Sequence, residues 1–173
     1  MPANEPHVTA YLGLGGNIGD PVAAMTEALY HLDEHRDCSV STVSRLYRTP
    51  PWGNTDQAWF FNAAAAIHTT LAPHPLLDLC LDIERSMKRI RAERWGPRTL
   101  DMDILAYGDV SVTDERLTLP HPRMKDRAFV LMPLADIAPD LVLEGRAVTA
   151  WLSDADRAGI EVAGQQRDWW RKS

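Results

Sequence analysis

The chain has 173 residues, of which 45% are hydrophobic and 24% are charged. That length and balance predict one globular domain over residues 1–173 and argue against collagen, coiled coil and intrinsic disorder. A net charge of −6 disfavours a nucleic-acid partner, and no apolar run reaches the roughly 20 residues of a membrane span. Two cysteines without zinc spacing, and no signal-peptide pattern in residues 1–7, predict a cytoplasmic protein.

The first half of the chain predicts a strand, a helix and two further strands. Residues 8–14 alternate apolar side chains with the period of two that is typical of a strand. Asp20 and Pro21 then start a helix, because Asp is a favoured N-cap and Pro a favoured first helical residue. Two β-rich segments follow, over residues 39–48 and 61–70, separated by a loop rich in Pro and Gly.

The second half predicts a helix, a strand with a hairpin, and a last helix. The expected elements are a helix over 76–88, a charged loop over 89–98, a strand over 100–107, a Gly108-Asp109 turn with a returning strand over 110–113, a short strand over 117–119 and a helix over 127–137. The order β-α-β-β-α-β is that of a ferredoxin-like α+β sheet with helices packed on it, followed here by an extra hairpin.

The sharpest local signal is the acidic pair Asp101 and Asp103. On a strand these side chains share one face, with Cα atoms about 6.6 Å apart, while their apolar neighbours face the core. Two carboxylates on one face can hold a divalent cation that also takes oxygens from substrate phosphates. A pair of solvated acids on an exposed face is the alternative, and the pair alone does not decide between them.

A basic run lies directly before the acidic pair. Six basic residues and a single acid, Glu93, stand between Arg85 and Arg98. Guanidinium groups bind phosphate oxygens, and cations beside paired carboxylates suit phosphoryl transfer. The alternative is a solvated helix end that complements the helix dipole, which accounts better for Arg85 and Lys88 than for Arg94 and Arg98.

Three further features bear on ligand binding. The glycine-rich segment after residue 12 lacks the third glycine of a dinucleotide motif, because Ile18 stands in its place. His121, between two prolines, is the histidine that we expect to contact phosphate. Aromatic residues near the loops could sandwich a flat heterocycle around Asn62, with ordinary core packing as the alternative; they are Trp52, Trp59, Phe60, Phe61, Trp95 and Phe129.

Together these residues resemble the 6-hydroxymethyl-7,8-dihydropterin pyrophosphokinase family. The resemblance runs from about residue 8 to residue 143 and leaves residues 144–173 as a tail without a derived role. The segments that carry it are Leu14-Gly15-Gly16-Asn17, Tyr47-Arg48-Thr49-Pro50-Pro51, Phe61-Asn62-Ala63-Ala64, Arg94-Trp95-Gly96-Pro97-Arg98-Thr99-Leu100-Asp101-Met102-Asp103-Ile104 and Leu119-Pro120-His121-Pro122-Arg123-Met124.

The resemblance implies an ATP-dependent pyrophosphokinase of tetrahydrofolate biosynthesis. Such an enzyme transfers pyrophosphate from ATP to the hydroxymethyl group of the pterin and releases AMP. Two Mg²⁺ ions would be held by Asp101 and Asp103, which share the catalytic role with Arg89 and Arg98. The implied pterin contacts are Thr49, Pro50, Pro51, Trp52, Phe60, Asn62 and Phe129. The implied ATP contacts are Glu84, Arg91, Trp95, Arg98, Ile104, Arg116, Thr118, His121 and Arg127. A monomer is expected.

The chain departs from the family pattern at a few positions. Gly16 stands where the family usually has Ser, and Phe60 where some members have Tyr. The stretch between Glu84 and Trp95 is one residue shorter than in well-known members, so the alignment of Arg89 and Arg91 stays open by one position. Two other functions remain alternatives: a Mg²⁺-dependent nucleotidyl- or glycosyltransferase, and a ferredoxin-like module that binds a small ligand or RNA without consuming ATP.

Overall fold

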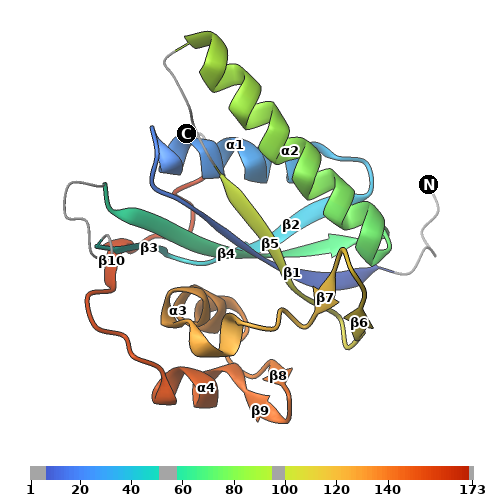
Figure 1. Cartoon of the computed structure of the whole chain (residues 1–173), viewed down its shortest axis with the longest axis vertical. Helices are drawn as coiled ribbons and strands as arrows, with labels where there is room; N and C mark the ends of the chain where they lie inside the picture. Colours follow the sequence, from blue (N-terminus) through green and yellow to red (C-terminus); the bar gives the residue numbers. More distant parts are fainter. Residues whose placement is uncertain (1–6, 51–57, 95–99, 172–173) are drawn as a thin grey trace.

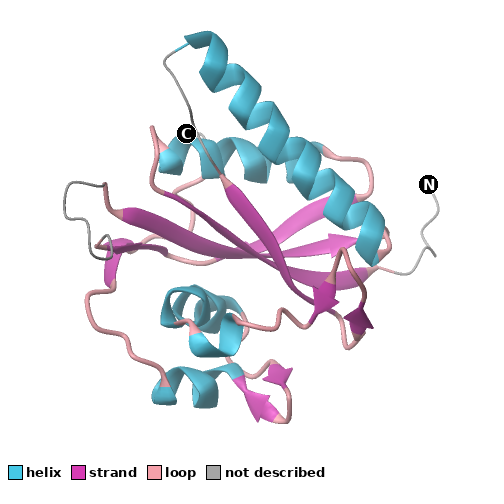
Figure 2. Ribbon diagram, in the orientation of Figure 1, coloured by secondary structure: helices cyan, strands magenta, loops and turns pink. Residues whose placement is uncertain are grey.

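An antiparallel sheet with helices on both faces forms the frame of the protein (Figures 1 and 2). The computed structural model describes residues 7–50, 58–94 and 100–171, and for residues 88–94 it describes the helical backbone. Two helices, α1 (Pro21–Glu34) and α2 (Pro73–Arg94), cover one face of the sheet. The other face carries α3 (Ala128–Ile137), with α4 (Val148–Asp154) packed beyond it. The chain is therefore built in layers around a central sheet.

The main sheet has the strand order β10-β3-β4-β1-β5, and β2 also pairs with β4. All of its pairings are antiparallel. The strands are β1 (Val8–Gly16), β2 (Cys38–Val43), β3 (Leu46–Thr49), β4 (Phe60–Thr69), β5 (Asp101–Tyr107) and β10 (Glu161–Gly164). Two small hairpins lie outside it, β6 (Val112–Thr113) with β7 (Thr118–Leu119), and β8 (Val142–Leu143) with β9 (Arg146–Ala147). This confirms a mixed arrangement of helices and antiparallel sheet.

Local sequence accounts for the start of α1 and for the two faces of β1. The Asp20 side chain accepts a hydrogen bond from Ala23 N at 3.0 Å and caps the helix, with Pro21 as its first residue. On β1, Leu12 and Leu14 are buried against the α1 and α2 layer. The alternate residues, Gly13 and Gly15, face the α3 side, where the pocket lies.

The strand expected over residues 39–48 is interrupted. The structure has two strands, β2 and β3, with Ser44 and Arg45 between them, and Ser44 N still donates to Ala64 O of β4 at 2.9 Å. Ser44 Oγ accepts from Ala64 N at 2.9 Å in place of a backbone group. Arg45 turns its side chain toward Asp136 on α3. The β-propensity of this segment gave no sign of a break, since it depends on a partner 91 positions away.

Two other expectations are corrected. Residues 89–94, expected as a charged loop, continue α2, which also starts earlier than expected, at Pro73. The strand after Gly108-Asp109 does not return along β5. The turn itself forms, with Val110 N bonded to Tyr107 O at 3.0 Å, but β6 pairs with β7 instead. Asp114 explains this, because its Oδ1 accepts from two amides of the following turn and closes the hairpin there.

The C-terminal segment packs on the sheet. Strand β10 pairs with β3 at its edge. Trp169 Nε1 donates to Ser44 O at 2.9 Å, and Trp170 is 3% exposed, with its ring 5.6 Å from that of Tyr30. Trp169 and Trp170 therefore dock on the core of their own chain. In the part of the chain described here, no helix has the length and apolar character needed to cross a bilayer.

Candidate functional site

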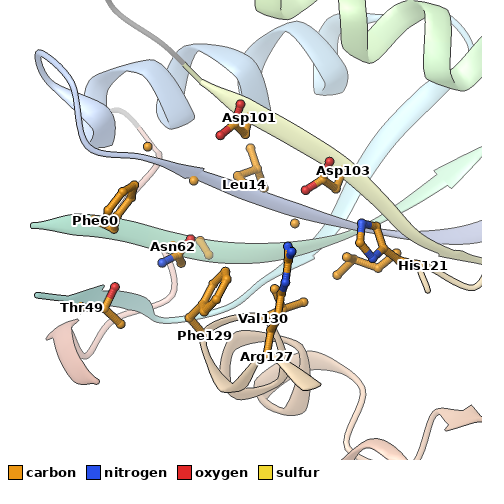
Figure 3. Close-up of a pocket in the computed structure, with 15 residues that line it drawn as sticks. Leu14, Thr49, Phe60, Asn62, Asp101, Asp103, His121, Arg127, Phe129 and Val130 are labelled. Atoms are coloured by element: carbon orange, nitrogen blue, oxygen red, sulfur yellow. The ribbon is translucent and has the colours of Figure 1, made fainter. Parts of the chain in front are cut away.

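A cavity of about 290 Å³ opens between the sheet and the N-terminal end of α3 (Figure 3). Four strands of the sheet and the start of α3 contribute to its wall. The residues that line it are Gly13, Leu14, Gly15, Gly16, Thr49, Phe60, Asn62, Ala63, Asp101, Asp103, Leu105, His121, Arg127, Phe129 and Val130. Eight of the side chains expected at the site from the sequence lie in this one cavity, although they come from segments far apart in the chain.

Strand register places the polar lining residues in one row. Asn62 on β4 is the direct partner of Gly15 on β1, and Gly15 is the direct partner of Asp101 on β5. On the other side of Asn62 stands Tyr47 of β3. Directly paired residues point to the same face of a sheet, so the row from Tyr47 to Asp101 faces α3. An amide and a carboxylate are thus held at fixed separation by backbone pairing alone.

Gly15 is needed for this row to form. A Cβ atom at this position would lie 2.5 Å from Asn62 Oδ1, which is closer than such contacts occur, and 3.3 Å from Phe61 O, which is tighter than most of them. The absence of a side chain therefore makes the room that the Asn62 carboxamide occupies. Gly13 differs, since its Cβ would meet Leu105 Cδ2 at an ordinary 3.5 Å.

The acidic pair lies on β5 as the alternation predicted. Asp101 and Asp103 are exposed and line the cavity, while Met102 and Ile104 are buried on the opposite face. β5 is an edge strand of the sheet, and the carboxylate of Glu84 on α2 covers part of that edge. Glu84 Oε2 accepts from Met102 N at 2.7 Å, at the residue between the two aspartates. This bond ties the position of the acidic pair to α2.

The pair fits a Mg²⁺ site that a substrate completes. Among the described residues, no group of three or more His, Cys, Asp and Glu is placed to hold a metal. Mg²⁺ commonly takes one or two carboxylates from the protein and its remaining oxygens from substrate phosphates and water. Asp101 and Asp103 supply two carboxylates on one face beside an open cavity, which matches that donor set.

The opposite end of the cavity is aromatic. Phe60 from β4 and Phe129 from α3 both line it, with Thr49 at the end of β3 nearby (Figure 3). Apolar ring faces together with a single carboxamide suit a flat, polar-edged heterocycle, because the rings bind its faces and the amide binds its edge.

Two basic side chains also line the cavity, and His121 lies beside Asp103, away from Phe60 (Figure 3). Arg127 precedes α3, and its guanidinium carbon lies 5.8 Å from the centre of the Phe129 ring. His121 Nδ1 accepts from Arg123 N at 3.2 Å, so the neutral ring carries its proton on Nε2. Burial lowers the pKa of His121, with Arg127 and Arg123 acting in the same direction and Asp103 opposing them. His121 is thus a neutral hydrogen-bond donor beside Asp103 at neutral pH.

Several residues expected at the site lie elsewhere. The Ile104 side chain is in the core, so only its backbone is left for a ligand. Arg116 pairs with Asp78 Oδ1 at 2.5 Å, and Thr118 lies on β7. Pro50 does not line the cavity. Pro51, Trp52, Trp95 and Arg98 lie outside the described residues, as do the side chains of Arg89 and Arg91.

The cavity also has lining residues that sequence reasoning missed. Leu105 and Val130 are apolar residues that a sequence cannot distinguish from ordinary core. Leu105 faces the cavity because it alternates with Asp101 and Asp103 along β5. The glycines offered a usable signal: Gly13 and Gly15 alternate within an otherwise regular strand, which indicates close approach of another group.

Comparison with known proteins agrees with these features. The sequence model of the 7,8-dihydro-6-hydroxymethylpterin-pyrophosphokinase (HPPK) family matches residues 11–139. The chain is 55% identical over 152 residues to the 2-amino-4-hydroxy-6-hydroxymethyldihydropteridine pyrophosphokinase of Methylorubrum extorquens, covering 88% of this chain and 96% of that one. It is 41% identical over 157 residues to the Bacillus subtilis protein of the same name, covering 91% of each.

A solved structure is similar in fold. The wild-type HPPK-DHPS of Plasmodium falciparum superposes with a TM-score of 0.67 at 16% identity, over 87% of this chain and 45% of that one. This chain therefore spans less than half of that longer protein, and the likeness concerns the fold alone.

Proposed function

Because this chain belongs to the 7,8-dihydro-6-hydroxymethylpterin-pyrophosphokinase family, we propose that the cavity of Figure 3 is where it transfers pyrophosphate from ATP to a pterin. The acceptor is the hydroxymethyl group of 6-hydroxymethyl-7,8-dihydropterin, and the products are the pterin pyrophosphate and AMP, in folate biosynthesis. The observation that supports this assignment is the row of Asn62, Gly15 and Asp101 across three paired strands. This row places the carboxamide proposed to bind the heterocycle beside the carboxylate proposed to bind metal and phosphate.

The acidic end is the proposed phosphate and metal site. Asp101 and Asp103 would hold two Mg²⁺ ions, which when bound neutralise phosphate charge and bring the phosphate chain and the hydroxyl together. Glu84 acts on this end through its bond to Met102 N, which fixes the strand that carries both aspartates. His121 donates from Nε2 toward phosphate oxygen, and Arg127 adds a fixed positive charge.

The remaining nucleotide contacts are proposed from the family resemblance. They are Arg91, Trp95, Ile104, Arg116 and Thr118, together with the catalytic pair Arg89 and Arg98. For Ile104, whose side chain is in the core, the contact would come from the backbone. Arg116 would have to exchange its partner Asp78 for a phosphate. Arginine is suited to this work because its planar fork matches phosphate oxygens.

The aromatic end is the proposed pterin site. Phe60 and Phe129 would stack on the two faces of the ring, and the Asn62 carboxamide would pair with its amide edge. Thr49, Pro50, Pro51 and Trp52 would add contacts at the end of β3. A ring held there places its hydroxymethyl group toward Asp101 and the β-phosphorus of ATP. The hydroxyl oxygen then attacks that phosphorus, and the bond between the β-phosphorus and the oxygen it shares with the α-phosphorus breaks. AMP leaves with that oxygen, and the hydroxyl proton passes to water.

Other expectations complete the proposal. The strand order is consistent with a ferredoxin-like topology, if β2 and β3 are counted as one interrupted strand. The packing of Trp170 in the main core supports a single domain over residues 1–173. The two buried free thiols are compatible with a cytoplasmic protein. We also propose a monomer, which light scattering after size-exclusion chromatography would test.

Product analysis tests the function. Purified protein is incubated with ATP, Mg²⁺ and 6-hydroxymethyl-7,8-dihydropterin, and nucleotides are separated by chromatography. AMP that forms only when the pterin is present is the expected result. ADP would indicate ordinary kinase chemistry, and pyrophosphate release would indicate a nucleotidyltransferase. Binding of the pterin without consumption of ATP would favour a binding module.

A further inference from the structure

A buried polar cluster joins α3 to β3 on the face of the sheet that carries the cavity. The Asp136 carboxylate, near the C-terminal end of α3, receives two hydrogen bonds from the Arg45 side chain, each at 3.1 Å, and one from Arg45 N, also at 3.1 Å. The Tyr47 hydroxyl lies 2.9 Å from Asp136 Oδ1 and 2.8 Å from Oδ2. Both carboxylate oxygens are therefore occupied by Tyr47 on β3 and by Arg45, which directly precedes that strand.

The hydrogen bonds of this cluster are shielded from water. Tyr47 is 1% exposed and the Asp136 side chain is 9% exposed. A buried carboxylate is retained only where charge and hydrogen bonds compensate for lost water. Burial and the hydrogen bond to Asp136 together raise the pKa of Tyr47 to about 12, so its hydroxyl stays a donor. Arg167 of the C-terminal segment adds a bond to Asp136 O at 2.6 Å.

The cluster and the cavity share the same face of α3. Asp136 follows Phe129 by seven positions, which is two helical turns, so both side chains project toward the sheet. Pro133 lies between them and has no N–H for the carbonyl of Phe129. Because α3 lacks the hydrogen bond between residues 129 and 133, the position of its first turn, which carries Phe129, depends more on contacts with the sheet.

The cluster and the cavity also share the same strand. Tyr47 and Thr49 alternate on β3 and point to the α3 side, and Thr49 lines the cavity. Tyr47 is in addition the direct cross-strand partner of Asn62. Asp136 thus belongs to the helix that carries Phe129, and Tyr47 is paired with Asn62 in the sheet.

We propose that Asp136, through Arg45 and Tyr47, is a positioning residue that sets where α3 sits on β3 and so fixes the gap between Phe129 and Asn62 in which the pterin binds. This rests on the proposed function of the cavity. The acidic end depends on β5 and α2, which the cluster does not touch. Loss of the cluster should therefore weaken pterin binding and leave nucleotide binding nearly unchanged.

Two variants test the proposal, Asp136→Asn and Tyr47→Phe. The second removes one hydroxyl from a buried ring and keeps its volume. Isothermal titration measures 6-hydroxymethylpterin binding with α,β-methylene-ATP and Mg²⁺ present, and α,β-methylene-ATP binding alone. Each variant should raise the pterin Kd about tenfold, because small misplacement of a binding group has effects of that size. The Kd of the nucleotide analogue should change by less than about twofold, as expected for independent sites.

Asp154→Asn is the matched control. Like Asp136→Asn, it removes one carboxylate charge. Asp154 lies on α4 and pairs with Arg146 at 2.8 Å, but its side chain is 68% exposed. Its pterin Kd should equal that of the wild type. If the Tyr47 and Asp136 variants lower the thermal midpoint but keep the pterin Kd, the cluster only stabilises the fold and the proposal is wrong. If the wild-type protein does not bind the pterin, the proposed function fails and this proposal fails with it.

Discussion

Single residues decide whether the cavity can form, and Gly15 is the most constrained of them. Gly15→Ala would place a methyl group 2.5 Å from Asn62 Oδ1. The Asn62 carboxamide would have to move, so we predict a loss of pterin affinity of about a hundredfold. Titration with 6-hydroxymethylpterin measures it. Gly13→Ala on the same strand is the control, because its methyl group would make an ordinary contact at 3.5 Å. Equal affinity in both variants would refute the steric argument.

Asp136 gives a prediction for pH at the same scale. Burial opposes its ionisation, but hydrogen bonds from Arg45 and Tyr47 outweigh burial, and the pKa of Asp136 lies below its ordinary 3.8. The unfolded chain binds this proton more readily, so the stabilisation is complete above the ordinary pKa and is lost as pH falls through the lowered one.

At neutral pH, Asp136→Asn should lower the free energy of unfolding by about 1–3 kcal/mol, the usual cost of unpairing buried polar groups. The difference between wild type and variant should shrink as acid is added below 3.8, the ordinary pKa of Asp136. Urea unfolding at a series of pH values measures this difference. A difference that stays constant through that range would contradict the assignment of the carboxylate as the ionised partner.

At the scale of elements, α2 supports the strand that bears the acidic pair. Glu84→Ala removes the acceptor for Met102 N at the edge of β5. Groups that orient metal ligands typically change metal affinity or activity by about 10–100-fold, and we expect the Mg²⁺ concentration needed for half-maximal AMP formation to rise by such a factor. Glu84→Gln keeps an acceptor oxygen for Met102 N, so its Mg²⁺ dependence should be close to that of the wild type.

Asp82→Ala is the control for that prediction. Asp82 lies on the same helix, but its side chain is exposed and pairs with Arg85. Exposed ion pairs contribute little, so the Mg²⁺ dependence of this variant should match the wild type. If Asp82→Ala and Glu84→Ala behave alike, the bond to Met102 has no special part in holding the acidic pair.

The elements also show what a sequence can and cannot predict. Period-two alternation correctly placed Asp101 and Asp103 on one strand face, and the Asp20-Pro21 pair correctly marked the start of α1. The break between β2 and β3 was missed, because it depends on contacts of Arg45 with α3 that no local pattern contains. The return strand after β5 was wrong for a similar reason, since Asp114 directs β6 to β7.

At the scale of the whole molecule, the C-terminal segment completes the core rather than extending from it. Trp170→Ala would empty a volume that is closed by Tyr30 and the α1 layer. Truncating a buried aromatic residue costs about 3–5 kcal/mol, and we expect a loss in the free energy of unfolding of that size. Urea denaturation provides the measurement.

Val142→Ala serves as the comparison, because Val142 is 61% exposed. Its effect should stay within about 0.5 kcal/mol, as for other surface substitutions. A Trp170→Ala protein as stable as the Val142→Ala protein would show that the tail packs only loosely. The sequence alone left this tail without a role, since two adjacent tryptophans fit a partner surface as well as a core.

The sequence likewise indicated most of the residues of the site, but not how they are arranged in space. Asn62, Asp101 and His121 were identified from their own segments, and strand register is what brings them to one cavity. Asp136 could not be identified from the sequence, because an acid in the last turn of an apolar helix carries no sign of its partners Arg45 and Tyr47.

The rate of AMP formation by the Asp101→Asn and Asp103→Asn proteins tests the central claim, that the β5 pair and the aromatic pocket act as one pyrophosphoryl-transfer site. Each variant and the wild-type protein are assayed in parallel with saturating ATP, Mg²⁺ and 6-hydroxymethyl-7,8-dihydropterin. Removing a group that stabilises developing charge typically costs about 10²–10³ in rate, so each variant should lose at least that much. Turnover by either variant at the wild-type rate would contradict the claim.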